Sequence, residues 1–190
     1  MGKKSTIDQL FVKVHNLLKK TKTPYILIGG LAAGVLGQPR FTQDADFLIF
    51  LDRNKLSGFL EIAKKEGLKF DKKKVERTIL ERGVFRLFLG NYHADFIINA
   101  LNFGKSVLKR KIAIKFFNRL VAFPTPEDLI LIKIIAGREL DLIDVKNIIL
   151  RNAEKIDKKY LTQWAQKISD ETENMRIWND LNKILKESPK

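Results

Sequence analysis

Three aspartates lie where their side chains can share one chemical task. Asp44 and Asp46 are separated by a single residue, in a run that is otherwise apolar up to Leu51. Asp95 lies in the apolar run 94–98. Residues two apart on a strand project from the same face, so Asp44 and Asp46 can share a hard cation such as magnesium. An ionised Asp95 is costly in apolar surroundings unless a cation or a donor compensates it. We therefore predict one site of three carboxylates, which suits two-metal phosphoryl transfer.

Two consecutive glycines precede these acids. Gly29 and Gly30 follow the short apolar run 25–28 and open a segment of small residues, 31–36. A strand that turns into a helix at glycine brings backbone amides and a helix N-terminus close to phosphate oxygens. Gly29 and Gly30 are therefore candidates for holding a triphosphate. A tight turn with close helix packing is the alternative interpretation.

Hydrophobic periodicity predicts the elements that must position these residues. The expected strands are residues 25–28, 44–51, 84–89 and 92–98, and Gly90-Asn91 has the chemistry of a two-residue hairpin turn between the last two. The expected helices are residues 7–20, 31–36, a stretch between 52 and 67, and C-terminal helices over 129–135, from Asp141, over 161–168 and over 175–185. Thr125-Pro126 is a strong helix start.

This order predicts an α/β (α+β) fold with a small mixed β-sheet flanked by helices and a helical C-terminal part. Residues 1–124 are expected to form the core, and residues 125–190 a helical lobe packed on it. The three acids are expected on one face of the sheet, with the helical lobe as the other wall of a cleft.

Composition narrows the chemistry further. The 190 residues are 45% hydrophobic and contain no cysteine, which excludes thiolate zinc sites and cysteine nucleophiles. Any metal must therefore be held by oxygen. No stretch has signal-peptide character or the length of a membrane span, so we expect a soluble cytoplasmic protein without a membrane partner. The formal net charge of +14 is compatible with a polyanionic ligand and equally with a solvated Lys- and Glu-rich surface.

The order of these motifs resembles the nucleotidyltransferase superfamily, typified by DNA polymerase β and by the aminoglycoside and lincosamide nucleotidyltransferases. The similarity consists of Ile28-Gly29-Gly30, a spacer over 31–43, Asp44-Ala45-Asp46 and the later Asp95. The segments 40–47 and 124–129, with Lys133, are most similar to small prokaryotic members related to abortive-infection type II toxins. The resemblance spans residues 25–150.

The resemblance implies the nucleotidyltransferase fold and a role for each motif. Asp44 and Asp46 would bind two catalytic Mg²⁺ ions, with Mn²⁺ as a substitute, and Asp95 would complete the site and help to deprotonate an acceptor hydroxyl. The residues implied to bind the nucleotide, with ATP among the candidates, are Gly29, Gly30, Arg40, Thr42 and Lys133. Asp141 and Asp144 are implied less directly.

Three of these candidates, and also His93, have simpler interpretations. Arg40 is suited to a charge-assisted phosphate contact, and solvent exposure is its alternative. Lys133 can instead extend from a buried helix toward water. Asp141 suits a helix cap. His93 shares the face of Asp95, with a structural role as the alternative.

The implied activity is metal-dependent transfer of a nucleoside monophosphate from a nucleoside triphosphate to an acceptor hydroxyl, with release of pyrophosphate. The acceptor is open between a small molecule, tRNA or another RNA, and a protein, and an antitoxin partner is open as well. The positive charge modestly favours RNA. A catalytically inactive nucleotide- or nucleic-acid-binding module with the same fold is the alternative, and the intact set of three acids argues against it.

Overall fold

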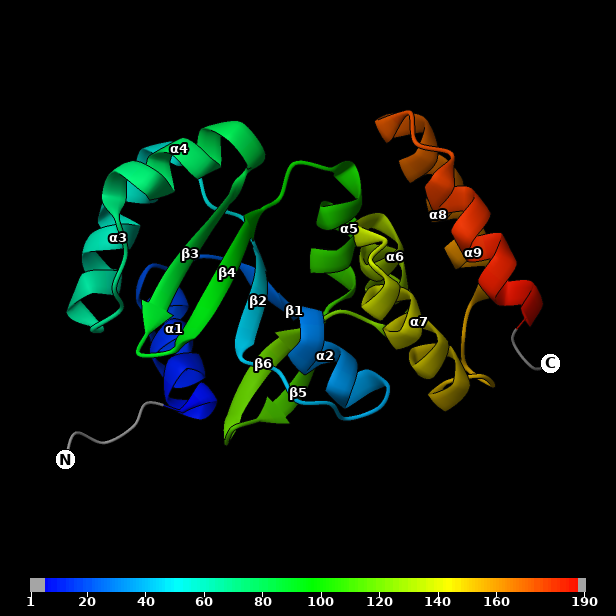
Figure 1. Cartoon of the computed structure of the whole chain (residues 1–190), viewed down its shortest axis with the longest axis horizontal. Coiled ribbons are helices and arrows are strands. Elements are labelled where there is room, and N and C mark those ends of the chain that lie inside the picture. Colours follow the sequence, from blue (N-terminus) through cyan, green and yellow to red (C-terminus); the bar gives the residue numbers. More distant parts are fainter. Residues whose placement is uncertain (1–5, 188–190) are drawn as a thin grey trace. The chain divides into compact units, whose positions relative to one another are not determined.

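The computed structural model describes residues 6–187 as two compact units (Figure 1). The first unit comprises the described residues up to Leu31 together with Phe41–Phe123. The second comprises Ala32–Arg40 and the described residues from Pro124 onward. The sequence predicts a boundary near residue 124, but it does not predict that residues 32–40 group with the C-terminal helices.

Alternating strands and helices form the first unit. In chain order, its elements are α1 (Ile7–Lys20), β1 (Tyr25–Ile28), β2 (Asp44–Ile49), the 3-10 turn η1 (Arg53–Lys55), α3 (Leu56–Lys65), α4 (Lys72–Arg82), β3 (Val84–Leu89), β4 (Tyr92–Ile98), α5 (Asn102–Arg110), β5 (Ile112–Phe116) and β6 (Arg119–Phe123). The second unit is helical. It holds the end of α2 (Gly29–Leu36) and the whole of α6 (Pro126–Ala136), α7 (Glu139–Arg151), α8 (Lys158–Thr172) and α9 (Arg176–Glu187). No described helix is long and apolar enough to span a bilayer.

The main sheet has the order β1-β2-β4-β3 and is mixed. Strands β2 and β4 are parallel, whereas β1 pairs antiparallel with β2 and β3 antiparallel with β4. Gly90 has a φ of +60°, which suits the predicted two-residue turn between Leu89 and Tyr92. The predicted mixed sheet and α/β fold class are confirmed.

One face of this sheet is packed against the apolar stripe of α1. Phe47, Phe85 and Phe96 are buried on this face, with ring centroids 5.6 Å apart for Phe47 and Phe96 and 4.8 Å apart for Phe85 and Phe96. Phe11 of α1 stacks on Phe47 at 6.1 Å. Because side chains alternate along a strand, the residues between these phenylalanines project from the opposite face. That opposite face carries the aspartates.

Several elements carry no clear signal in the sequence. Helix α4 is highly charged and buries only Val75 and Ile79, although Asp71 caps its start by accepting a hydrogen bond of 3.0 Å from the Lys74 amide. The hairpin of β5 and β6 turns through Phe117 and Asn118, both at positive φ. Phenylalanine is not a usual residue for such a turn, so this hairpin is missed from the sequence.

Of two helix starts predicted in the second unit, one is confirmed and the other is wrong. Helix α6 begins as predicted, with the Thr125 hydroxyl accepting from the Asp128 amide at 3.3 Å, and it ends at Gly137 in the left-handed region. The predicted cap at Asp141 is wrong. Helix α7 begins at Glu139, so Asp141 lies inside its first turn and its carboxylate accepts hydrogen bonds from other side chains.

Candidate functional site

The register of the central strands brings the predicted acids onto one face. In the parallel pair β2–β4, Asp44 lies opposite His93 and Asp46 opposite Asp95. Neighbouring strands are about 4.8 Å apart, so these four side chains form a compact polar patch on this face. All four are partly exposed, whereas Ala45 between the first two acids is completely buried. The strands thus present Asp44, Asp46 and Asp95 to the same solvent-facing region.

Gly29 lies against the carboxylate of Asp46. Residue Ile28 pairs with Asp46 across β1 and β2, and Gly29 then turns the chain into α2 with a φ of +69°. A Cβ atom at Gly29 would clash with the Asp46 carboxylate. Glycine is therefore required here for two independent reasons, the left-handed backbone and the close approach. Gly30 follows as a buried residue of the helix.

Thr42 contacts Asp44 directly. Its hydroxyl donates to the Oδ1 atom of Asp44, and it lies 3.5 Å from the Asp44 amide nitrogen, from which it can accept. The threonine thus orients the first carboxylate of the site. Its predicted contact with a nucleotide stays a prediction.

Arg86 holds the third carboxylate at two points. Its Nε and Nη2 atoms donate to the Oδ1 and Oδ2 atoms of Asp95 at 2.6 and 2.7 Å, a fork geometry that fits a carboxylate. The hydrogen bonds to Asp95 raise the pKa of Arg86 against the opposing effect of burial, and the charges of Asp95, Asp44 and Asp46 raise it further. His93 is close as well, with its Nε2 atom 3.9 Å from Asp95 Oδ2.

The donor set fits magnesium in kind, since it consists of carboxylates on one face and magnesium prefers hard oxygen ligands. In the arrangement over residues 6–187, however, no three His, Asp or Glu side chains are grouped closely enough to hold one ion. Arg86 occupies both oxygens of Asp95. Asp44 and Asp46 are therefore the metal-binding candidates in this arrangement, while the carboxylate of Asp95 is held by Arg86 and keeps one lone pair on each oxygen for a further partner.

Lys133 and Arg40 belong to a separate, buried ion network in the second unit. Lys133 is 2% exposed, and its Nζ atom donates to Asp141 Oδ1 and to Asp144 Oδ2, both at 2.8 Å. Arg40 donates to both oxygens of Asp144 at 3.1 and 3.2 Å, and Arg138 donates to Asp141 at 2.6 Å. Burial raises the pKa of Asp141, but the hydrogen bonds from Arg138 and Lys133 outweigh it and leave the pKa below its ordinary value.

This network changes the interpretation of three candidates. Lys133 does not reach water, so the alternative of a snorkelling lysine is wrong. Arg40 is bound to Asp144 and is not simply a solvated loop residue. Each of Lys133 and Arg40 forms an ion pair with a carboxylate of its own unit. Their predicted nucleotide contacts stay predictions.

Arg86 is the residue that the sequence-based predictions miss. The two-residue turn at Gly90-Asn91 places Leu89 opposite Tyr92, and counting back along both strands places Arg86 opposite Asp95. The signal was therefore present in the predicted hairpin. To find Arg86, the register of the two strands must be predicted as well as their existence.

Comparisons with known proteins identify the family and the fold. A family model described as a nucleotidyltransferase of unknown function (DUF6036) matches residues 5–188. The fold is similar to a lincosamide antibiotic adenylyltransferase, LnuA, in its lincomycin-bound crystal structure, with 18% identity over 76% of this chain and 97% of that one and a TM-score of 0.50. It is also similar to the antibiotic-resistance factor ANT(2'')-Ia, with 11% identity over 87% of this chain and 94% of that one and a TM-score of 0.57. The sequence matches no curated protein.

Proposed function

Because this chain belongs to a family of nucleotidyltransferases of unknown function (DUF6036), we propose that Asp44, Asp46 and Asp95 form its active site. The proposed reaction moves a nucleoside monophosphate from a nucleoside triphosphate to an acceptor hydroxyl and releases pyrophosphate. One observation carries this assignment: the strand register sets Asp46 beside Asp95 and Asp44 on the same face, with Gly29 against Asp46.

The proposed metal ligands are Asp44 and Asp46, with Asp95 as a third ligand through a lone pair that Arg86 leaves free or after the ion pair opens. Magnesium bound there would neutralise phosphate charge and polarise the phosphorus that is attacked. Thr42 holds the Asp44 carboxylate in place through its hydroxyl. The absence of a side chain at Gly29 gives the Asp46 carboxylate its place beside the turn, and the backbone amides of that turn are the proposed contacts of a phosphate.

In the proposed step, Asp95 accepts the proton of the acceptor hydroxyl. The acceptor oxygen forms a bond to the α-phosphorus, the bond from this phosphorus to the bridging oxygen breaks, and pyrophosphate leaves with that oxygen. Arg86 has two roles in this proposal. It pairs with Asp95 before substrate binds, and its guanidinium, which stays charged at every physiological pH, offers a fork of donors to the incoming phosphates.

The acceptor is the least constrained part of the proposal. Similarity below 25% identity to an antibiotic adenylyltransferase and to an antibiotic-resistance factor supports the fold and not the acceptor. A small hydroxylated molecule, tRNA or another RNA, and a protein are therefore all to be screened. The net charge of +14 supports placing RNA first in that screen. An antitoxin partner rests on the resemblance alone.

A turnover assay tests the proposal. Each triphosphate is incubated with magnesium and a panel of small-molecule, RNA and protein acceptors, and pyrophosphate release is measured for the wild type, D46N and D52N. Asp52 is a matched control because it is an exposed aspartate just beyond the end of β2. We expect release by the wild type and D52N and none by D46N. Undiminished release by D46N would refute the assignment, and no release by the wild type with any acceptor would favour the inactive binding module.

A further inference from the structure

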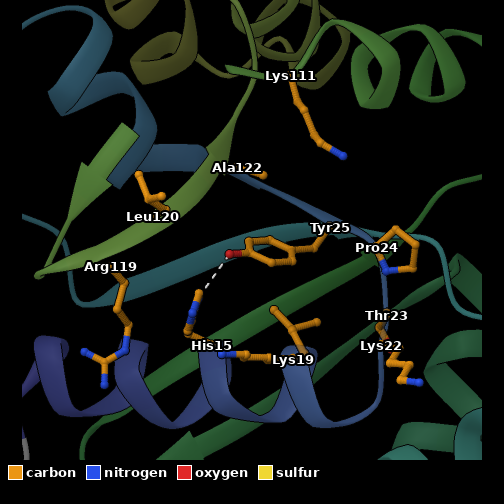
Figure 2. A pocket seen from close by; sticks show the side chains of 11 residues that line it. His15, Lys19, Lys22, Thr23, Pro24, Tyr25, Lys111, Arg119, Leu120 and Ala122 are labelled. Carbon is orange, nitrogen blue, oxygen red and sulfur yellow. Dashed lines mark hydrogen bonds between the residues drawn. The ribbon is translucent and has the colours of Figure 1, made fainter. Parts of the chain in front are cut away.

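A pocket of about 630 Å³ opens in the first unit (Figure 2). Its walls come from the end of α1, the start of β1, the link between α5 and β5, and β6. Tyr25 lies at its centre in Figure 2, where its hydroxyl points toward His15, and the two are hydrogen-bonded at 3.1 Å. The pocket therefore has a polar and aromatic floor.

This pocket lies on the opposite side of the sheet from the aspartates. Tyr25 and Leu27 share one face of β1, and Leu27 pairs with Phe47, which alternates with Asp46 along β2. The rings of Tyr25 and Phe47 are in contact at 6.0 Å between centroids. A ligand of the pocket therefore contacts residues other than Asp44, Asp46 and Asp95, and the two sites can be tested separately.

The charge of the pocket is positive on every side. Four cations line it, and no aspartate or glutamate does; the cations are Lys19, Lys22, Lys111 and Arg119. Over residues 6–187 none of the four forms an ion pair, in contrast to Lys20 of the same helix, which pairs with Glu66 at 2.5 Å. Burial lowers the pKa of His15, and the positive charges of Arg119 and Lys19 lower it further.

The pocket also offers the chemistry of side chains and not of a backbone anion nest. The backbone amides at the end of α1 are already used, because those of Thr21 and Thr23 donate to the carbonyls of Leu17 and Leu18 at 2.9 and 3.0 Å. The four cations come from three segments, namely the end of α1, the link before β5, and β6, and they stand around the pocket in Figure 2. Cations spread on flexible stems around an aromatic floor match a row of separated phosphates better than one isolated phosphate.

We propose that this pocket binds consecutive backbone phosphates of a single-stranded nucleic acid. Lys19, Lys22, Lys111 and Arg119 contact the phosphates, and the face of Tyr25 is available to a base. Binding of this kind depends on charge and not on base identity, because phosphate contacts carry no sequence information. The proposal stands independently of the nucleotidyl transfer, because it uses the other side of the sheet.

The test measures the anisotropy of a labelled oligouridylate of about 12 nucleotides across a range of salt concentrations. The pocket variant is K19Q/K111Q/R119Q, and the matched control is K65Q/K73Q/K74Q, which removes three exposed charges from α3 and α4. Each phosphate contact on a single strand contributes about 0.7 to the slope of log K against log salt, so the pocket variant should lose about 2 from that slope. At about 0.1 M salt this corresponds to binding weaker by on the order of 100-fold. The control should lose far less.

Two further measurements keep the outcome decisive. K19R/K111R/R119K retains the charges and should bind as the wild type does, and thermal unfolding of every variant checks that the fold is intact. D46N should bind the oligonucleotide normally. Equal weakening in the pocket and control variants would show diffuse charge attraction and overturn the proposal, as would undiminished binding in a folded pocket variant. Titration with pyrophosphate forms the second arm: pocket-dependent binding of pyrophosphate without binding of the oligonucleotide would assign the pocket to a small phosphorylated ligand instead.

Discussion

Arg86 and Asp95 face each other across the β3–β4 hairpin and form a two-point ion pair of 2.6 and 2.7 Å. The pair is half exposed, so its contribution to folding is modest, at about 0–1 kcal/mol. Its consequence is functional. One arginine fixes the orientation of the acid that the proposed reaction uses as a base, and its positive charge competes with a cation for that acid.

Removing this arginine should strengthen metal binding. In R86M, Asp95 loses its partner and three neighbouring carboxylates repel one another, so a divalent cation should bind about tenfold more tightly, equivalent to ~1.4 kcal/mol. Calorimetric titration with Mn²⁺ in the absence of nucleotide measures the change. R77M is the control, since Arg77 also faces an acid, Glu81, at 3.9 Å on the exposed side of α4. Unchanged Mn²⁺ affinity in R86M would show that the pair does not restrain Asp95.

Alanine at Gly29 should damage both stability and the site. The substitution forces a left-handed φ on an L-residue and drives a methyl group into the Asp46 carboxylate, so we expect a loss of about 1–3 kcal/mol in the free energy of unfolding. Urea denaturation measures it. G58A is the control, because Gly58 lies in helix α3 with open space around it and alanine should stabilise it by up to ~1 kcal/mol. Equal stability of G29A and the wild type would contradict the close approach.

Lys133 should be important for stability. K133M removes the cation between two buried carboxylates, Asp141 and Asp144, and should cost about 3–5 kcal/mol in the free energy of unfolding. R138M, which removes an arginine that is 75% exposed, should cost less than about 1 kcal/mol. Urea denaturation of both variants distinguishes them. A small loss in K133M, together with weakened nucleotide binding, would instead support the predicted nucleotide contact.

His15 should make the protein less stable in mild acid. Its pKa in the folded state is lowered by burial, Arg119 and Lys19, so the unfolded chain binds the proton more readily. The penalty is absent well above the unfolded pKa of about 6.5 and grows as the pH falls from there toward the folded value. H15Q should therefore lose less stability than the wild type between about pH 7.5 and about pH 5.5. Parallel losses in urea denaturation would show that His15 does not carry the effect.

Much of the fold and of the acid set follows from the sequence. Asp44 and Asp46 are predicted to share a face because a strand alternates with a period of two, and Asp95 is marked by its apolar neighbours. Gly29 and the Gly90-Asn91 turn are found because glycine at the end of an apolar run indicates a turn with positive φ or a close approach of the backbone. These signals are local, so they survive without knowledge of the tertiary structure.

The rest depends on contacts between distant residues. Lys133 lies in a helix that is apolar on almost every side, and nothing local indicates that Asp141 and Asp144 neutralise it. The pairing of Arg40 with Asp144 joins residues 104 positions apart. The basic pocket likewise combines segments from residue 15 to residue 122. Hydrophobic periodicity and residue propensity predict helices and strands, but they do not predict which distant side chains come into contact.

Calorimetric titration of each nucleoside triphosphate into the wild type and D46N, with magnesium and with chelator, tests the proposed active site most directly. We predict magnesium-dependent binding to the wild type and to D52N, and binding to D46N that is at least about tenfold weaker, or ~1.4 kcal/mol. Equal magnesium-dependent binding by D46N, or binding that persists in chelator, would contradict the assignment of Asp46 as a metal ligand.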